Sequence, residues 1–431
     1  MDSGSPSSVG FDNTDLEHLP GEMSCAPLQQ RKQQIEYPNH SVHPELACET
    51  VLLPSPPGDS FTFVELFAGI GGFRLGLEAL GGRCVFASEI LPDCVALYEA
   101  NFGHEPQVSG DICRVNEDSI PAHDLLVGGF PCQPFSSLGD QPGLSDQKGV
   151  LFMEIVRILR KHRPRAFLLE NVPGLLTCDE GRAISRIISE LEDVGYSVSL
   201  EKLDSRCLTA QSRYRVFISG IRQDGNSDIQ GKAFQFPYVP DLMVRAGDIL
   251  ESDEQLLAAG ASELHTMSQK RFERLRDTKK ARLRYGVHNL AWEDTICGTL
   301  TAHYGKDLQR GDSQLVPGPE YPRRFTPREC ARLMGFPEDY DLGRPTGPGT
   351  NMENVWCTSR YGMFGNAVCP PMIAAVAGAV LAHCPSMSSD RDWVAAGRSA
   401  AIQLALRALP PQHREKILGR LHPSFRDAAR D

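Results

Sequence analysis

Short apolar runs alternate with amphipathic stretches between about residues 61 and 222. The apolar runs are FTFVELF, CVFASEI, DLLVGG, AFLLEN and RVFISGI, and stretches such as VLFMEIVRILRKH and RAISRIISELEDVG have helical spacing. This alternation predicts an α/β fold, with a mostly parallel, doubly wound sheet that carries helices on both faces. AFLLEN and DLLVGG are apolar without interruption, which is typical of central strands buried on both sides.

The alternation stops at about residue 223. Residues 223–322 are polar, rich in Gly and Pro and without clear βα units, which indicates an inserted domain or a long binding region. In RRFTPRECARLMGFP, Thr326, Pro327 and Glu329 occupy the N-cap, N1 and N3 positions of a helix that starts with a capping box. NAVCPPMIAAVAGAVLAHC (366–384) predicts an apolar helix packed on the sheet, and a basic amphipathic stretch without an evident role follows it.

Composition adds few constraints. The chain has 431 residues, 41% of them hydrophobic and 23% charged, and no run of 18 apolar residues that would predict a membrane span. Its first residues are acidic and lack the apolar segment of a secretory signal. The 13 cysteines include no CxxC pair, so we expect a reducing compartment, with neither a disulfide framework nor a zinc site.

Charge is distributed unevenly within the net value of −11. Residues 1–60 have nine Asp/Glu against two Lys/Arg, and the first 58 contain eight prolines without periodicity, which predicts a disordered acidic tail. Residues 270–284, KRFERLRDTKKARLR, have eight Lys/Arg against two Asp/Glu. This basic run is an exposed helix face or a phosphate contact, because local charge rather than total charge decides contact with nucleic acid.

A glycine cluster follows the first predicted strand, in FVELFAGIGGFRLGLEALGG. Gly69, Gly71 and Gly72 allow a tight turn close to a ligand, and the next helix offers free N–H groups. Glu89 follows Gly69 by 20 residues, at a strand end where a carboxylate can accept both ribose hydroxyls of a cofactor, and Asp111 is placed to accept from an adenine amino group. The spacing GIGGF departs from the dinucleotide fingerprint and favours a cofactor without pyrophosphate, such as S-adenosylmethionine.

Reactive side chains follow later strands. Cys132 follows the fourth predicted strand, and Glu170 and Asn171 end the fifth, all at the carboxyl edge where open α/β sheets bind ligands. Gln211, Arg213 and Arg215 are spaced two apart and would share one face of a strand. Two arginines on one face can hold a phosphate or an anionic intermediate.

A thiol and a carboxyl group beside such a cofactor suit methyl transfer to a ring carbon. C5 of cytosine becomes nucleophilic after a thiolate adds to C6, and a carboxyl group held partly neutral can stabilise the adduct at N3. Methylation of an exocyclic amine needs no thiol and usually has an Asp/Asn-Pro-Pro-aromatic loop, where this chain has Phe-Pro-Cys-Gln. No histidine adjoins Cys132, so its thiolate would depend on the arginines, backbone dipoles or the cofactor's positive charge.

The chain resembles the DNA (cytosine-5)-methyltransferases. FAGIGGF, GGFPCQPFS, ENV, QSRYR, RRFTPRECARLMGFP and YGMFGNAV stand in the order that the family shows, over roughly residues 61–385. The resemblance implies a Rossmann-like methyltransferase domain with a smaller target-recognition domain. It also implies methyl transfer from S-adenosylmethionine to C5 of cytosine in double-stranded DNA, through a covalent adduct between Cys132 and C6 of a flipped base.

The resemblance implies roles for single residues. Cys132 would be the nucleophile, Glu170 would contact N3 and the amino group of cytosine, Arg215 would contact the ring oxygen, and Arg213 would support the site. The cofactor would be lined by Phe67, Ala68, Gly69, Gly71, Gly72, Glu89, Asp111, Ile112, Pro131 and Asn366. DNA would be contacted by Gln133 and Ser136 of a closing loop, Gln211, Lys279, Lys280 and Arg282 of the basic run, and Thr299 and Leu300 of a Thr-Leu signature.

The expected domain organisation follows from these motifs. It comprises a disordered tail (1–58), a catalytic S-adenosylmethionine-binding domain (59–235), a target-recognition region (236–335), a return to the catalytic domain (336–385) and a C-terminal helical tail (386–431). We expect a monomer without metal or membrane contact. Its expected compartment is intracellular and reducing, the nucleus in a eukaryote or the cytoplasm and nucleoid in a bacterium.

Two alternatives keep the same fold. A tRNA cytosine-5 methyltransferase usually has Pro-Pro-Cys-Gln and a Cys-Phe-Thr segment, whereas here Phe130 precedes Pro131 and the later segment is CGTLTA, which favours DNA. A catalytically inactive nucleic-acid-binding homologue would have lost the thiol, the acid or the arginines, and all of them are present.

Overall fold

Seven strands form one sheet within the part of the chain that the computed structural model describes. That part comprises residues 61–131, 147–223, 234–258, 290–304, 314–318, 320–343, 350–384, 391–426 and six residues between 265 and 273. Residues 50–431 belong to one compact unit. The tail predicted over residues 1–58 lies outside the described residues.

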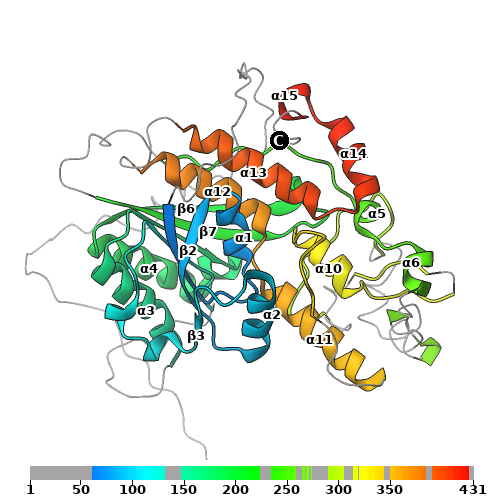
Figure 1. The fold of residues 1–431 in the computed structure, drawn as a ribbon, viewed down its shortest axis with the longest axis horizontal. Coiled ribbons are helices and arrows are strands. Elements are labelled where there is room, and N and C mark those ends of the chain that lie inside the picture. The colour runs from blue at the N-terminus through cyan, green and yellow to red at the C-terminus, as the bar shows by residue number, and fades with distance from the viewer. Residues whose placement is uncertain are drawn as a thin grey trace, which may run out of the picture. The chain divides into compact units, whose positions relative to one another are not determined.

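The sheet has the strand order β3-β2-β1-β4-β5-β7-β6. All pairs among β1 to β5 are parallel, whereas β7 runs antiparallel to both β5 and β6. The fold is therefore the predicted α/β class, with an antiparallel hairpin at one end of a parallel sheet (Figure 1). The strands are β1 (Phe61–Leu66), β2 (Gly82–Ser88), β3 (Val108–Ser109), β4 (Leu125–Gly128), β5 (Ala166–Asn171), β6 (Tyr196–Asp204) and β7 (Tyr214–Arg222).

Helices cover both faces of the sheet (Figure 1). Those of the described residues are α1 (Gly72–Glu78), α2 (Pro92–Phe102), α3 (Gln147–His162), α4 (Arg182–Asp193), α5 (Ala246–Ile249), α6 (Asp253–Ala258), α10 (Pro327–Leu333), α11 (Thr350–Asn366), α12 (Pro370–Ala382), α13 (Trp393–Arg407), α14 (Pro411–Arg420) and α15 (Pro423–Arg426). Short 3-10 helices η1 to η5 start at Ile112, Glu117, Pro173, Cys178 and Ser205.

Alternate residues of the central strands enter two different cores. Phe63 of β1 and Leu168 of β5 pack with α1, α12 and α13, whereas Val64 and Leu169 pack with α3 and α4. This alternation is the period-two geometry of a strand, and it requires apolar side chains on both faces. Every residue of β4 and β5 is buried, as the uninterrupted apolar runs predict.

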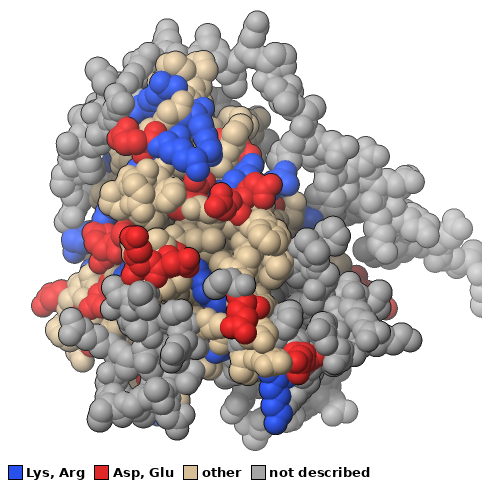
Figure 2. Space-filling model, turned by 90° about the vertical axis from the view of Figure 1, so that its right-hand side faces the viewer, with Lys and Arg blue, Asp and Glu red and all other residues tan. Residues whose placement is uncertain are grey.

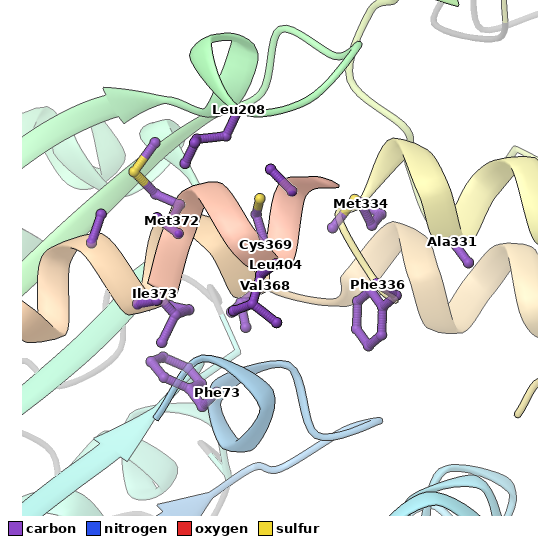
Figure 3. Close-up of a cluster of buried hydrophobic side chains, with 14 of the residues drawn as sticks. Phe73, Leu208, Ala331, Met334, Phe336, Val368, Cys369, Met372, Ile373 and Leu404 are labelled. Atoms are coloured by element: carbon purple, nitrogen blue, oxygen red, sulfur yellow. The ribbon is translucent and has the colours of Figure 1, made fainter. Parts of the chain in front are cut away.

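Helix α12 lies at the centre of the larger core. Figure 3 shows Val368, Met372 and Ile373 on and beside this helix, with Phe73 of α1 below them and Met334 and Phe336 to one side. The helix begins at Pro370 rather than at residue 366 as predicted, because Cys369 precedes a proline and adopts an extended conformation.

The stretch Val355–Ala382 has the length and the hydropathy of a possible membrane span, but 89% of its apolar window is buried inside the protein. Core packing therefore accounts for its composition.

The capping box predicted at Thr326 is confirmed. Thr326 Oγ1 accepts from the N–H of Glu329 at 3.1 Å, and Glu329 Oε2 accepts from the N–H of Thr326 at 2.8 Å. Glu329 also binds both terminal nitrogens of Arg323 at 2.8 Å, so the start of α10 is fixed to the preceding segment.

The C-terminal residues predicted as a helical tail are integrated into the fold. Helices α13 to α15 follow α12, and α13 crosses α12 where Gly378 and Gly397 face each other without side chains between them. Ile417 and Leu418 of α14 are buried in the larger core. This segment therefore belongs to the same hydrophobic core as the sheet.

Candidate active site

The strand register brings the ends of four strands to one level. Leu66, the last residue of β1, pairs with Ser88 of β2 and with Gly128 of β4, and Gly128 pairs with Leu169 of β5. The residues that follow these positions therefore lie along one carboxyl edge of the sheet, where parallel α/β folds place their ligands. They include the glycine loop (residues 67–71), Glu89 and Glu170. They also include residues 129–131, which form the lead-in to Cys132.

The glycine loop turns sharply after β1. Phe67, Gly69 and Gly71 all have positive φ values, of 55°, 54° and 78°. The N–H of Ala68 donates to Ser88 O at 2.9 Å, and the N–H of Gly71 donates to Ala68 O at 2.9 Å. The loop is thus tied to the end of β2 and leads into α1, whose N-terminus has no side-chain cap.

Gly69 and Gly71 require glycine for different reasons. A Cβ on Gly69 would meet no atom within 4 Å, so only its left-handed backbone disfavours a side chain. A Cβ on Gly71 would lie 2.2 Å from a ring carbon of Phe102, which packs against this turn from α2. The open space beside Gly69 suits a ligand, whereas the contact at Gly71 fixes the loop.

Glu89 and Asp111 lie on neighbouring strand ends, because the N–H of Glu89 donates to Ser109 O at 2.9 Å. Glu89 is nearly buried, and its two oxygens accept from the N–H groups of Gly69 and Leu91, each at 2.8 Å. A carboxylate has about four acceptor positions, so Glu89 keeps capacity for ribose hydroxyls while it orients the glycine loop. The side chain of Asp111 caps η1 by accepting a hydrogen bond from Cys113 N–H at 3.0 Å. Ile112, the first residue of this 3-10 helix, is buried.

The lead-in to the predicted nucleophile is fixed by Asn171, at the end of β5. Asn171 Nδ2 donates to Phe130 O at 2.9 Å, and its Oδ1 accepts from Val172 N–H at 2.8 Å. Pro131 is exposed directly after this anchor. Cys132, Gln133 and Ser136 lie outside the described residues, and the structure fixes the point where their segment begins.

Glu170 and Arg215 form a nearly buried ion pair beside that lead-in. Glu170 Oε1 lies 3.0 Å from Arg215 Nε, although this contact lacks hydrogen-bond alignment, and a Cβ on Gly129 would lie 3.9 Å from Glu170 Oε2. Burial raises the pKa of Glu170, and the charges of Arg215 and Arg213 oppose that shift. Burial is the largest of these effects, so the net shift of the Glu170 pKa is upward at this edge of the sheet.

Arg213 serves as a buried anchor. Its Nη1 donates to Leu300 O at 2.9 Å, and its Nη2 donates to Gly365 O at 3.0 Å and to Ala367 O at 2.7 Å. The two latter carbonyls flank Asn366, the exposed last residue of α11. Burial lowers the pKa of Arg213 to about 9, so the guanidinium is charged at neutral pH and positions the neighbouring segments.

The prediction that Gln211, Arg213 and Arg215 share one strand face is wrong, because β7 begins at Tyr214. Gln211 is fully buried: its Nε2 donates to Leu333 O at 2.9 Å and its Oε1 accepts from Leu300 N–H at 2.6 Å. Leu300 is also buried, and Thr299 Oγ1 donates to Ser212 O at 2.9 Å.

Hydrogen bonds of Gln211, Thr299 and Leu300 therefore join the 297–300 segment to the residues that precede β7. The side chains of Gln211 and Leu300 are buried, and the DNA contact of this segment stays a prediction. Lys279, Lys280 and Arg282 lie outside the described residues.

Sequence reasoning assigned no role to two residues that the structure places next to these segments. Asn171 was visible as a polar residue at the end of an apolar strand. Glu65, the penultimate residue of β1, is fully buried and accepts from the hydroxyl of Tyr98 at 3.0 Å, and Arg74 Nη1 lies 3.4 Å from that hydroxyl. Burial raises the pKa of Glu65 to about 8, so its carboxyl is mostly protonated at neutral pH directly before the glycine loop. An acid inside FTFVELF was the available signal.

Among the described residues, no group of three or more His, Cys, Asp or Glu side chains is arranged to hold a metal ion.

Solved structures with similar folds are methyltransferases. The Dnmt2 methyltransferase of S. pombe superposes with a TM-score of 0.57 over 75% of this chain and 98% of its own, at 21% identity. Entamoeba histolytica methyltransferase EhMeth gives a TM-score of 0.54 over 74% of this chain and 97% of its own, at 17% identity. The sheet thus has the Rossmann-like methyltransferase fold.

Sequence comparison identifies the family. The family model for C-5 cytosine-specific DNA methylase matches residues 61–382, and the chain belongs to this family as a DNA cytosine-5 methyltransferase. Type II methyltransferase M.DsaV of Dactylococcopsis salina is 37% identical over 77% of this chain and 89% of its own. M.NlaX of Neisseria lactamica is 38% identical over 77% and 99%, and M.HhaI of Haemophilus parahaemolyticus is 34% identical over 71% and 90%.

Proposed function

We propose that this chain transfers the methyl group of S-adenosylmethionine to C5 of a flipped cytosine in double-stranded DNA, through a covalent bond between Cys132 Sγ and C6. The observation that carries the proposal is the nearly buried pair of Glu170 and Arg215 beside the lead-in to Cys132. A carboxyl group with a raised pKa at that place suits a group that donates to N3 of the base.

The residues of the glycine loop fit the proposed cofactor. Glu89 retains acceptor capacity for ribose hydroxyls, Asp111 is half-buried at the neighbouring strand end, and the space beside Gly69 is open. The turn lacks the spaced glycines that a pyrophosphate requires. When bound, S-adenosylmethionine supplies the electrophilic methyl group and leaves as S-adenosylhomocysteine.

Cys132, Glu170 and Arg215 have separate roles in the proposed reaction. The Cys132 thiolate forms the Sγ–C6 bond, and the electron pair of the C5–C6 double bond becomes available at C5 while Glu170 donates its proton or a hydrogen bond to N3. After C5 has gained the methyl group, loss of the C5 proton to a base restores the double bond and releases the Cys132 thiolate. Arg215 holds the carboxyl group of Glu170 in place and offers donors to the ring oxygen.

A methyl-transfer assay tests the proposal. The full chain is incubated with S-adenosylmethionine carrying a tritiated methyl group and either unmethylated plasmid DNA or tRNA, and cofactor affinity is measured by calorimetry. We expect transfer to C5 of cytosine in DNA, and loss of that transfer in Cys132→Ala with the cofactor affinity retained. Transfer to tRNA alone, or normal turnover of the alanine variant, would contradict the proposal.

A further inference from the structure

The C-terminal helices contact the segment that follows the catalytic domain. Helices α13 to α15 lie beyond residues 61–382, which the family model covers. Ile417 and Leu418 anchor α14 in the larger core. On another side of this helix, His413, Lys416 and Arg420 recur at the three- and four-residue spacing that places side chains on one helical face.

All three side chains of that face reach the segment at Met243–Asp248. Lys416 Nζ lies 2.8 Å from Asp248 Oδ1, and His413 Nδ1 lies 3.6 Å from the same oxygen. Arg420 Nη1 donates to Met243 O at 3.4 Å. Residues separated by more than 160 positions in the sequence are thus joined by a contiguous set of polar contacts.

The carboxylate of Asp248 depends on a counter-charge, because its side chain is only 2% exposed. The side chain of Lys416 is 51% exposed. Asp248 Oδ2 accepts from Arg245 N–H at 3.0 Å and so caps α5. Without Lys416, the partner that remains for Oδ1 of this nearly buried carboxylate among the described residues is His413, at 3.6 Å. A nearly buried charge that loses its partner is destabilising, so this pair has more effect than a pair on the open surface.

Helix α5 connects in turn to segments nearer the site. The N–H of Ala246 donates to Thr295 O and that of Gly247 to Glu293 O, each at 2.9 Å. Two residues further along, Cys297 N–H donates to Ala210 O at 2.7 Å, in the strand-like bridge beside Gln211. The contacts of α14 are therefore linked through α5 to the 293–300 segment, and that segment is joined to Arg213.

Helix α5 also contacts α10. Arg332 Nη1 donates to Ile249 O at 2.9 Å, and Glu251 N–H donates to Glu329 Oε1 at 2.8 Å. Figure 2 looks onto the side where α5, α6 and α14 lie in Figure 1, and Lys and Arg gather in its upper part above separate groups of Asp and Glu.

We propose that α14 is a brace, which holds α5 and the 293–300 segment in the position that this enzyme uses to recognise DNA, and that Lys416 is its positioning residue. This inference rests on the proposed function for its substrate, while its structural part is independent of activity.

Hydrogen exchange of the full chain tests the structural part. In Lys416→Met, we expect the amides of residues 246–250 and 293–297 to exchange about threefold to tenfold faster, because removing the partner favours local opening. Lys416→Arg should restore protection. Arg414→Met is the control, because it removes the same charge from the same helix. In the described part of the chain, Arg414 donates to Leu409 O and Arg407 O, both within the C-terminal segment.

Kinetics on unmethylated plasmid DNA test the functional part. We expect Lys416→Met to raise KM for plasmid DNA about fivefold, while kcat and the affinity for S-adenosylmethionine stay within about twofold. The effects of Lys416→Met and Asp248→Asn should be less than additive in the double variant, because both remove the same pair. A purely structural loss would lower the melting temperature without this split between KM and kcat.

The brace is overturned if exchange in Lys416→Met equals that in Arg414→Met, or if exchange accelerates while KM for plasmid DNA is unchanged. Absence of methyl transfer by the unaltered protein on any DNA would refute the proposed function instead, and hydrogen exchange would still decide whether the brace exists.

Discussion

Arg215 Nε lies 3.0 Å from Glu170 Oε1, and this contact joins the end of β5 to the start of β7 at the edge where Pro131 leads to Cys132. Burial raises the pKa of Glu170 and lowers that of Arg215, while the attraction between them opposes both shifts. Each side chain thus supplies the opposite charge that its nearly buried partner needs, while burial still raises the pKa of Glu170.

Replacing Glu170 by Gln should separate catalysis from binding. The amide keeps the shape and can donate a hydrogen bond, but it cannot transfer a proton to N3, so we expect kcat to fall by about 10² to 10⁴ while S-adenosylmethionine affinity is unchanged. Steady-state rates on plasmid DNA and calorimetry measure the two quantities. Glu192→Gln, on the exposed side of α4, is the control, and an equal loss of activity there would contradict the role of Glu170.

Arg213→Met should destabilise the protein rather than alter one chemical step. The change leaves the carbonyls of Leu300, Gly365 and Ala367 without their buried donor, and we expect a loss of about 3 kcal/mol or more in the free energy of unfolding. Urea denaturation measures it. Arg206→Met, at a side chain that is 45% exposed, should cost less than about 1 kcal/mol, and similar losses for both variants would show that the three carbonyls are not held by Arg213.

Two glycines of the cofactor loop should respond differently to alanine. Both have positive φ, which costs about 1 to 2 kcal/mol for alanine, but only Gly71→Ala also places a Cβ 2.2 Å from the ring of Phe102. We expect Gly71→Ala to be the less stable variant and to weaken S-adenosylmethionine binding through displacement of the loop. Thermal unfolding and calorimetry of the two variants check this. Equal stability of the variants would mean that the Phe102 ring moves aside without a measurable loss of stability.

Glu65 should make stability depend on pH. Its pKa is about 8 in the folded chain against an ordinary value of 4.5, so between these values the folded state binds more protons than the unfolded state, and stability falls as pH rises. The slope attributable to this one proton is at most about 1.4 kcal/mol per pH unit.

Glu65→Gln should remove this contribution, so its free energy of unfolding should decline less steeply than that of the unaltered protein between pH 5 and about 8. Urea titrations at several pH values measure the difference. Parallel curves for the two proteins would show that Glu65 titrates normally.

The local sequence pattern was sufficient to predict the strands and the helix cap that position the site. AFLLEN and DLLVGG were recognisable as doubly buried strands because every position is apolar or strand-terminal, and Thr326 and Glu329 cap α10 through a contact over three residues. Such features depend on neighbours in the sequence, so their physical cause is present in the sequence itself.

The contacts that assemble the site join distant residues. Arg213 meets Gly365 across 152 positions and Lys416 meets Asp248 across 168, and no periodicity encodes such a pairing. The same limitation explains the error at Gln211. Its spacing from Arg215 suggested a shared strand face, but its amide is fixed by Leu333 and Leu300, which lie far along the chain.

Covalent trapping tests the central claim most directly. The full chain is incubated with S-adenosylmethionine and double-stranded DNA in which 5-fluorocytosine replaces cytosine, and the products are separated under denaturing conditions. Because fluorine cannot leave C5 as a proton does, we expect a stable protein–DNA complex that Cys132→Ala does not form. Methylation of ordinary DNA of the same sequence without any trapped complex on the fluorinated DNA would contradict the covalent mechanism.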